Sequence, residues 1–156
     1  MKKEGGEQMK RDFAVAVKAI IIREEKALIL HRSPQEIESS YMNRREKWDL
    51  PGGGIHYFEH SSEGLIREIR EETNLSVKII KPLSLFDVIK PHIHLCIFTY
   101  VCLYEAGEVQ LSAEHDRYLW LTLEQMSEYD IPNWMKRDFK QAFLEIEWEK
   151  QKNKFL

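Results

Sequence analysis

The chain has 156 residues, of which 43% are hydrophobic and 31% charged, and its formal net charge is −3 at pH 7. This length suits one domain with one core, and the slightly acidic balance excludes the general attraction to nucleic acid that a basic surface provides. The apolar runs are far shorter than the roughly 20 residues that span a bilayer, and no secretory signal is visible, so we expect a cytoplasmic protein that spans no membrane.

The first part of the chain predicts a flexible end followed by a β-hairpin. Residues 1–11 are polar, contain glycine and lack periodicity, which is typical of a flexible segment, and we expect the folded domain at residues 12–152. Two runs rich in aliphatic and β-branched residues, 13–22 and 27–32, flank a charged tetrapeptide. This alternation predicts two strands joined as a hairpin.

A long connection and a glycine-rich turn come next. Residues 33–47 are long for a connection in a compact domain, and such connections are usually functional or mobile. A short strand is predicted over residues 48–51, in which we expect Trp48 to pack in the core. The three glycines at positions 52–54 then predict a turn whose main chain can approach a ligand closely.

The following segment predicts a helix with a row of carboxylates. The helix covers residues 62–73, and a serine at position 61 or 62 is its expected N-cap. Glu68, Glu71 and Glu72 are spaced i, i+3 and i+4, so on a helix they share one face. Crowded like charges weaken a helix unless a cation lies among them, and Mg²⁺ or Mn²⁺ suits clustered carboxylates. The alternative is a solvated acidic face.

The second half of the chain predicts further strands and a closing helix. Residues 76–80 and 82–90 carry strand signals, and the longest strand candidate, 92–104, is apolar on both faces and therefore covered on both sides. The remaining predicted elements are a short strand at 109–111, a helical turn at 124–129, and a helix from Asn133 to about Lys150. We expect this last helix to cover the sheet face opposite to the 62–73 helix.

The longest strand candidate also carries both cysteines and two histidines. Cys96 and Cys102 would lie roughly 20 Å apart along the strand, which is too far for a disulfide. His92 and His94 share one face and can in principle help to bind zinc. No CxxC or HExxH motif accompanies them, so the sequence does not predict a zinc site.

The spacing of glycine, glutamate and arginine in residues 53–75 resembles the Nudix box. That pattern reads Gly-x5-Glu-x7-Arg-Glu-U-x-Glu-Glu-x-Gly-U, where U is a bulky aliphatic residue, and eight of its nine specified positions match here. The exception is Asn74 in place of glycine. Asparagine readily adopts the left-handed conformation that ends a helix, so the helix can still terminate there. A softer departure is Phe58, where many members have glycine.

The resemblance covers roughly residues 13–148 and implies both a fold and an activity. The implied fold is a single-domain α/β/α sandwich with a mixed β-sheet. The implied activity is Mg²⁺-dependent hydrolysis of a diphosphate linkage, usually in a nucleoside diphosphate derivative, with Mn²⁺ as a substitute ion. The partner is then a small nucleotide or another diphosphate compound, while the oligomeric state and the leaving group remain open. Nucleoside triphosphates, sugar nucleotides, ADP-ribose and dinucleoside polyphosphates are all substrates of proteins with this box.

The resemblance also implies roles for the residues of the box. Glu68 and Glu72 are the expected principal metal ligands, and Glu71 is a third ligand that binds directly or through water. Glu59 is expected nearby, either at a second metal ion or holding the turn. Arg67 is expected to orient the carboxylates by charge-assisted hydrogen bonds.

Two residues are candidates for the proton acceptor. Residues 111–123 are similar to the segment that brings an acidic loop over the metal site in many Nudix enzymes. Glu114 is the candidate there, either as a further metal ligand or as the base, and Glu71 is the other candidate for the base. His115 and Asp116 are weaker alternatives. The alternative for Glu114 is an exposed loop acid without a catalytic role.

Four residues are candidates for substrate binding. Gly53 and Gly54 are expected to form a wall of the diphosphate site. Arg32 either contacts a substrate phosphate or is a polar residue at the end of a strand. Arg44 either contacts a substrate phosphate or belongs to a solvated cluster of charges in the loop.

Two other activities fit the same resemblance. A non-catalytic Nudix module would bind a nucleotide as a sensor or docking domain, but every acid of the box is retained, which favours an enzyme. RNA cap removal is disfavoured because the chain lacks a basic stripe.

Overall fold

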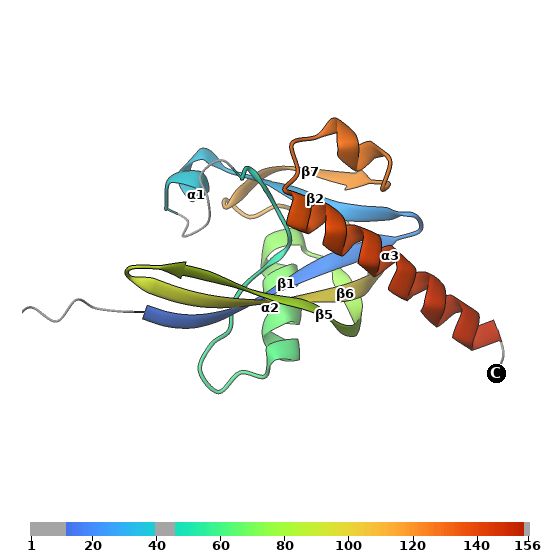
Figure 1. Ribbon diagram of the computed structural model, residues 1–156, viewed down its shortest axis with the longest axis horizontal. Helices are drawn as coiled ribbons and strands as arrows, with labels where there is room; N and C mark the ends of the chain where they lie inside the picture. The colour runs from blue at the N-terminus through green and yellow to red at the C-terminus, as the bar shows by residue number, and fades with distance from the viewer. Residues whose placement is uncertain (1–11, 40–45, 155–156) are drawn as a thin grey trace, which may run out of the picture.

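The computed structural model describes residues 12–39 and 46–154 (Figure 1). Its strands are β1 (Asp12–Arg23), β2 (Lys26–Arg32), β3 (Trp48–Asp49), β4 (Gly52–Gly54), β5 (Ser76–Lys90), β6 (Ile93–Ala106) and β7 (His115–Leu121). Its helices are α1 (Pro34–Ser39), α2 (Ser61–Thr73), the 3-10 helix η1 (Gln125–Glu128) and α3 (Asn133–Lys154). The predicted flexible segment 1–11 lies outside the described residues, as do residues 40–45 of the predicted connection 33–47, which include Arg44.

Strand β1 organises a mixed sheet. Within the described residues the strand order is β3-β2-β1-β6-β5, and β4 pairs with β1 while β7 pairs with β2. β1 runs parallel to β6 from Asp12 to Ile22 and antiparallel to β2 at the predicted hairpin. The hairpin prediction is therefore confirmed, and Glu24 occupies the turn with a left-handed φ of 58°.

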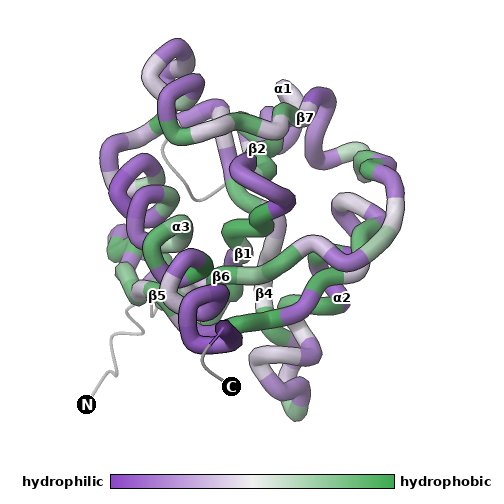
Figure 2. The backbone as a smooth tube through the Cα atoms, turned by 90° about the vertical axis from the view of Figure 1, so that its right-hand side faces the viewer, coloured by the Kyte–Doolittle hydropathy of each residue, from purple (hydrophilic) through white to green (hydrophobic). Residues whose placement is uncertain are grey.

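The two faces of β1 pack into two separate cores. Val17, Ala19 and Ile21 belong to a cluster with Leu65 and Ile69 of α2. The alternate residues of β1 belong to a second cluster with α3, whose buried members are Met135, Phe139, Ala142 and Ile146. The strand period of two and the helical spacing together produce this arrangement, so α2 and α3 cover opposite faces as predicted. Figure 2 shows the hydrophobic stretches of β1, β2 and β6 between the helices.

Both ends of α2 have a clear physical basis. At the C-terminus Asn74 adopts the left-handed conformation (φ 63°, ψ 16°), and its N–H donates to the carbonyl of Arg70. At the N-terminus the predicted serine cap is wrong, because His60 holds the cap position and makes no side-chain cap bond. Ser61 is already helical, and its hydroxyl accepts a hydrogen bond of 3.2 Å from Tyr100.

Several predicted boundaries are also corrected. The triple glycine is strand β4 and not a turn, since it pairs antiparallel with β1. Residues 76–90 form one strand, because irregularities in register accommodate Pro82, which lacks an N–H donor, on an edge strand of the sheet. The predicted strand at 109–111 is absent. Instead the N–H groups of Gln110 and Ser112 donate to the carbonyls of Thr73 and Glu72, which satisfies the end of α2.

Across residues 12–39 and 46–154, we find no helix that combines the length and the apolar character needed to cross a membrane.

Candidate active site

Two carboxylates of α2 reach a cavity of about 390 Å³ on the far side of strand β4. The cavity is lined by Ala14, Ala16, Lys18, Glu36, Ser39, Asp49, Gly52, Gly53, Gly54, Glu68, Glu72, Ile93, Leu95, Ile97 and Glu114. Helix α2 packs on the opposite face of the sheet, but the three residues of β4 carry no side chains. Glu68 and Glu72 can therefore extend past this strand into the cavity.

Glu72 is the buried carboxylate of the site. It is 4% exposed, and its Oε2 accepts a hydrogen bond of 3.0 Å from the N–H of Gly52. Burial raises the pKa of Glu72 to about 9, and the attraction of Lys18 offsets only part of this effect. A cation bound beside Glu72 would stabilise the ionised form of this buried carboxylate.

Glu68 lies directly against Gly53. A Cβ placed on Gly53 would lie 2.7 Å from Cδ of Glu68, closer than ordinary contact allows. Gly54 differs, since a Cβ there would have no atom within 4 Å. The absence of a side chain at position 53 is therefore what permits the Glu68 carboxylate to occupy its position.

Arg67 joins several carboxylates of the box in one hydrogen-bond network. Its Nε donates to Glu59 Oε2 at 2.7 Å and its Nη2 to Glu59 Oε1 at 3.0 Å. Its Nη1 donates to Glu68 at 2.9 Å and to Glu71 at 3.3 Å, and Nη2 also reaches the carbonyl of Gly54 at 3.0 Å. These contacts leave the guanidinium occupied by the protein, as an orienting role requires.

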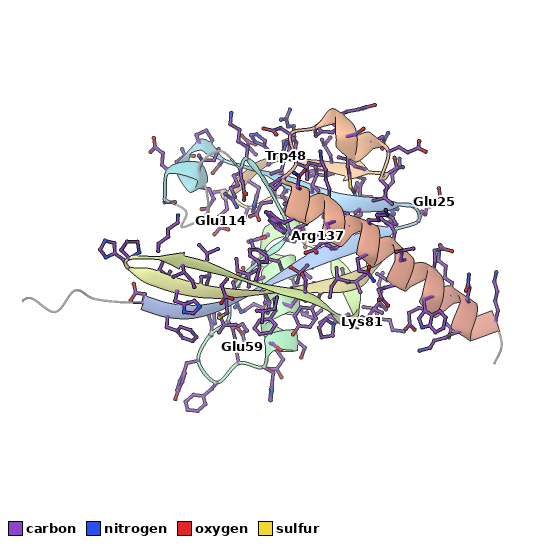
Figure 3. The ribbon with its side chains drawn as sticks, in the orientation of Figure 1. Glu25, Trp48, Glu59, Lys81, Glu114 and Arg137 are labelled. Atoms are coloured by element: carbon purple, nitrogen blue, oxygen red, sulfur yellow. The ribbon has the colours of Figure 1, made fainter. Side chains whose placement is uncertain are left out.

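Glu59 is held by the same network. Hydrogen bonds from Arg67, followed by one from the N–H of His56, lower the pKa of Glu59 to about 2. Its Oε1 also lies 2.8 Å from the place where a Cβ of Gly64 would be, so glycine at 64 makes room for it. Glu59 does not line the cavity, and Figure 3 shows it on the other side of the β5–β6 ribbon from Glu114.

The three helical carboxylates do not share one environment. The side chains of Glu68 and Glu71 are 15% and 59% exposed, and Glu71 contacts Arg67 but is not among the lining residues of the cavity. The three residues do share one face of the helix, as predicted, but the packing around them gives their side chains different surroundings. Glu68 and Glu72 face the cavity, whereas Glu71 lies on the solvent side of Arg67.

A second group of donors comes from the first residue of β7, His115, and the residue before it, Glu114. Candidate ligand atoms of Glu72, Glu114 and His115 all lie within 4.8 Å of one another. The carbonyl of Glu114 accepts a hydrogen bond of 2.9 Å from the N–H of Ser33, which ties this segment to the start of α1. His115 is buried, and among the described residues its Nδ1 has no hydrogen-bond partner. Two carboxylates beside Glu68 make an oxygen-rich donor set of the kind that hard divalent cations prefer.

Sequence reasoning missed a buried lysine beside these carboxylates. Lys18 Nζ donates to Asp49 Oδ2 and to the carbonyls of Leu50 and Gly52, each at 3.2 Å. Burial alone would lower the pKa of Lys18, but the attraction of Asp49 and Glu72 outweighs it and raises the pKa. The available signal was its position, because Lys18 is the one charged residue in the apolar interior of β1.

Asp49 is the centre of this buried charge network. Burial alone would raise its pKa, but Lys18, a hydrogen bond from His115 and Arg32 together lower it well below the usual range. Arg32 is 2% exposed, donates to the carbonyl of Glu46 at 3.0 Å and lies 3.6 Å from Asp49 Oδ2. The predicted contact of Arg32 with a substrate phosphate thus gains no support, since this guanidinium is buried against Asp49 and does not line the cavity.

Two tryptophans pack against other aromatic rings, and for Trp48 this was expected. Trp48 is 6% exposed and meets the rings of His31 and Tyr129 edge-on at 5.0 and 5.6 Å. Trp134 packs against Phe86 at 4.8 Å.

Comparisons with known proteins are consistent with one family. Residues 12–143 match the model of the NUDIX domain. The chain is 32% identical over 96 residues to nucleoside triphosphatase NudI of Escherichia coli O17:K52:H18, an alignment that covers 54% of this chain and 68% of that protein. It is 31% identical over 96 residues to the NudI of Shigella flexneri, with the same coverage of 54% and 68%.

Solved structures agree with these sequence matches. The MutT protein of Methanosarcina mazei Go1 is 26% identical, has a TM-score of 0.69, and is matched over 88% of this chain and 98% of its own. An Ap4A hydrolase of C. elegans, in a binary complex, has a TM-score of 0.67 at 21% identity over 84% of this chain and 97% of its own. The second likeness shows the fold alone.

Proposed function

Because the chain belongs to the Nudix family of hydrolases, we propose that it is a Mg²⁺-dependent enzyme that cleaves a diphosphate linkage in a nucleoside diphosphate derivative. One observation carries this proposal. Glu68, Glu72 and Glu114 line a single cavity, with the glycine strand as one wall. A reacting diphosphate needs such a cavity, since it must meet both a cation and main chain that can approach it closely.

The donor set supports magnesium. Glu68 and Glu72 would be the principal ligands, and Glu71 would be a third that acts directly or through water, with Mn²⁺ as a substitute ion. Glu59 would either lie at a second ion or hold the turn. When bound, Mg²⁺ would lower the pKa of a water molecule and offset the charge that builds on the phosphate oxygens. The elevated pKa of Glu72 supports the same assignment, because a cation bound beside it would stabilise the ionised form of this buried carboxylate.

Other residues of the protein would orient the metal ligands and accept the proton. Arg67 holds Glu59 and Glu68 in place, so their orientation does not depend on the substrate. Lys18 donates hydrogen bonds to Asp49 and to the carbonyl of Gly52, and so ties the glycine strand to β1 and β3. For the proton acceptor, Glu114 is preferred over Glu71, because Glu114 lines the cavity and Glu71 does not.

The substrate is proposed from the wall of the cavity and from the relatives. Ala14, Ala16, Ile93, Leu95 and Ile97 form an apolar side that suits the uncharged part of a nucleotide. The NudI relatives are named nucleoside triphosphatases, so nucleoside triphosphates are the first class to test. Sugar nucleotides, ADP-ribose and dinucleoside polyphosphates follow.

The test is a substrate panel with purified full-length protein. Release of phosphate, diphosphate and nucleoside monophosphate is measured for each compound with Mg²⁺, with Mn²⁺ and with chelator. We expect turnover of at least one class that requires the metal ion. Nucleotide binding without turnover on any compound would contradict the proposal and favour the non-catalytic module instead.

A further inference from the structure

A second cluster of metal-ligating side chains lies outside the candidate active site, on the hairpin of β5 and β6. Nε2 of His94 lies 2.8 Å from Asp87 Oδ1, and Sγ of Cys96 lies 3.2 Å from the same oxygen. The Cys96 Sγ and His94 Nε2 atoms are 3.8 Å apart. Three donors of different types, a carboxylate, an imidazole and a thiol, thus lie within 4.8 Å of one another.

The sheet register brings these residues together. Asp87 and Cys96 are direct partners in the antiparallel β5–β6 pair. His94 precedes Cys96 by two residues and so lies on the same face, diagonal to Asp87. The ring of Phe13 meets the His94 ring edge-on at 5.3 Å and restricts its orientation. Figure 1 shows the start of β1, which carries Phe13, beside this hairpin.

The cluster lies on the opposite face of the sheet from the cavity. Ile93, Leu95 and Ile97 of β6 line the cavity, and His94 and Cys96 alternate with them along the strand. An ion bound at the cluster would therefore lie across the sheet from the cavity that Glu68 and Glu72 line.

We propose that Asp87, His94 and Cys96 form a zinc-binding site with three protein ligands. With Zn²⁺ bonds of roughly 2.0–2.3 Å, the donors of a tetrahedral site lie roughly 3.3–3.6 Å apart. Each of the three observed separations differs from this range by roughly half an ångström or less, which small side-chain rotations supply. On binding, the Cys96 thiol loses its proton to solvent, and His94 gives up its Nε2 proton, so that the neutral ring carries its proton on Nδ1. The hydrogen bonds that Asp87 accepts from these two groups are replaced by a bond to the ion.

Ligand chemistry selects zinc over magnesium here. Thiolate and imidazole are soft or intermediate ligands that favour Zn²⁺, whereas Mg²⁺ prefers oxygen ligands such as the carboxylates of Glu68, Glu72 and Glu114. A thiolate and a carboxylate would also neutralise the charge of the ion. The side chains of Asp87 and His94 are 45% and 43% exposed, so water can reach the fourth position of the tetrahedron.

The site would have a structural consequence for the sheet edge. β5 is the last strand in the order β3-β2-β1-β6-β5, and an ion held by Asp87 and Cys96 would cross-link it to β6. Because such binding is specific to the folded chain, zinc should raise the Tm of the protein.

The test uses Co²⁺ as a spectroscopic probe, followed by Zn²⁺ titration, on the purified full-length chain. Wild type should bind Co²⁺ with a thiolate-to-cobalt charge-transfer band and the visible bands of a tetrahedral site, and Zn²⁺ should displace it. The chain has two cysteines, so Cys102→Ala is the matched thiol control and should keep the band. Cys96→Ser should abolish the band and weaken zinc binding by at least roughly tenfold.

Further variants separate this site from the carboxylate cavity. Glu72→Gln should leave the band unchanged, since Glu72 lines the carboxylate cavity and is not a ligand of the Cys96 cluster. Asp87 is an exposed residue of the edge strand β5, so Asp87→Asn should fold and provides a second test if Cys96→Ser does not. The proposal is overturned by a wild type without the thiolate band, by a band that persists in Cys96→Ser, or by equal zinc affinity in Asp87→Asn and wild type.

Discussion

The N–H of Gly52 donates a hydrogen bond of 3.0 Å to Oε2 of Glu72, across 20 positions of sequence. This bond joins strand β4 to helix α2 at the floor of the cavity. Gly52 has a φ of 141°, and a Cβ there would collide with the carbonyl oxygen of Val17, so only glycine can bring this N–H to the carboxylate. The glycine strand therefore positions a candidate metal ligand as well as forming a wall.

The first prediction concerns Glu72 itself. Glu72→Gln keeps the shape of the side chain and an oxygen for the Gly52 N–H, but it removes the negative charge. We expect turnover to fall by about a hundredfold or more with the fold intact, as for a group that stabilises charge in the transition state. Steady-state hydrolysis and circular dichroism measure the two effects. Glu63→Gln, an exposed change on the same helix, is the control, and near-normal hydrolysis by Glu72→Gln would refute the assignment.

The second prediction compares two neighbouring glycines. In Gly53→Ala the added Cβ would lie 2.7 Å from Cδ of Glu68 and displace that carboxylate, whereas in Gly54→Ala it would meet nothing within 4 Å. We expect a much larger loss of kcat in Gly53→Ala than in Gly54→Ala, at similar Tm. Equal kcat values for the two variants would mean that the Glu68 position does not matter for the reaction.

The third prediction concerns the orienting arginine. Arg67→Lys keeps one positive charge but loses the fork that holds Glu59 by two hydrogen bonds, at 2.7 and 3.0 Å. We expect the Mg²⁺ concentration for half-maximal activity to rise by roughly tenfold to a hundredfold, as for other residues that support metal ligands. A Mg²⁺ titration of hydrolysis measures this shift. Arg70→Lys, on the same helix, should leave the titration unchanged, and an unshifted curve for Arg67→Lys would count against its role.

The fourth prediction concerns stability and its dependence on pH. Asp49→Asn would leave the buried cations Lys18 and Arg32 without their shared partner, so the free energy of unfolding should fall by about 3–5 kcal/mol at neutral pH. The pKa of Asp49 is lower in the folded protein than in the unfolded chain, because its cationic partners outweigh burial. Its contribution is therefore complete above the ordinary carboxyl pKa of about 4 and is lost as the pH falls toward the lower folded value.

Urea unfolding of wild type and Asp49→Asn, at neutral pH and below about pH 4, measures this contribution. The gap between the two proteins should narrow in acid. Asp116→Asn is the matched control, because Asp116 is 48% exposed and pairs with His31 at the surface. That change should cost no more than about 1 kcal/mol. A loss in Asp49→Asn as small as that of the control would contradict the buried network.

Sequence alone determined the local geometry of this protein. The spacing of Glu68, Glu71 and Glu72 follows from the helical period, and Asn74 ends the helix because asparagine tolerates a left-handed φ. The apolar residues on both faces of β6 likewise predicted a strand covered on two sides. These features depend on neighbours within about two turns of chain, so no distant residue was needed to predict them.

Only the tertiary structure decided which polar groups meet. Whether Glu71 or Glu72 is buried depends on where β4 crosses the helix, and the pairing of Lys18 with Asp49 spans 31 positions of sequence. The same holds for Asp87 beside His94 and Cys96, which local motifs did not reveal because the register of two strands creates the cluster. Burial and cross-strand register are properties of the packed sheet, and a single sequence does not state which strands become neighbours.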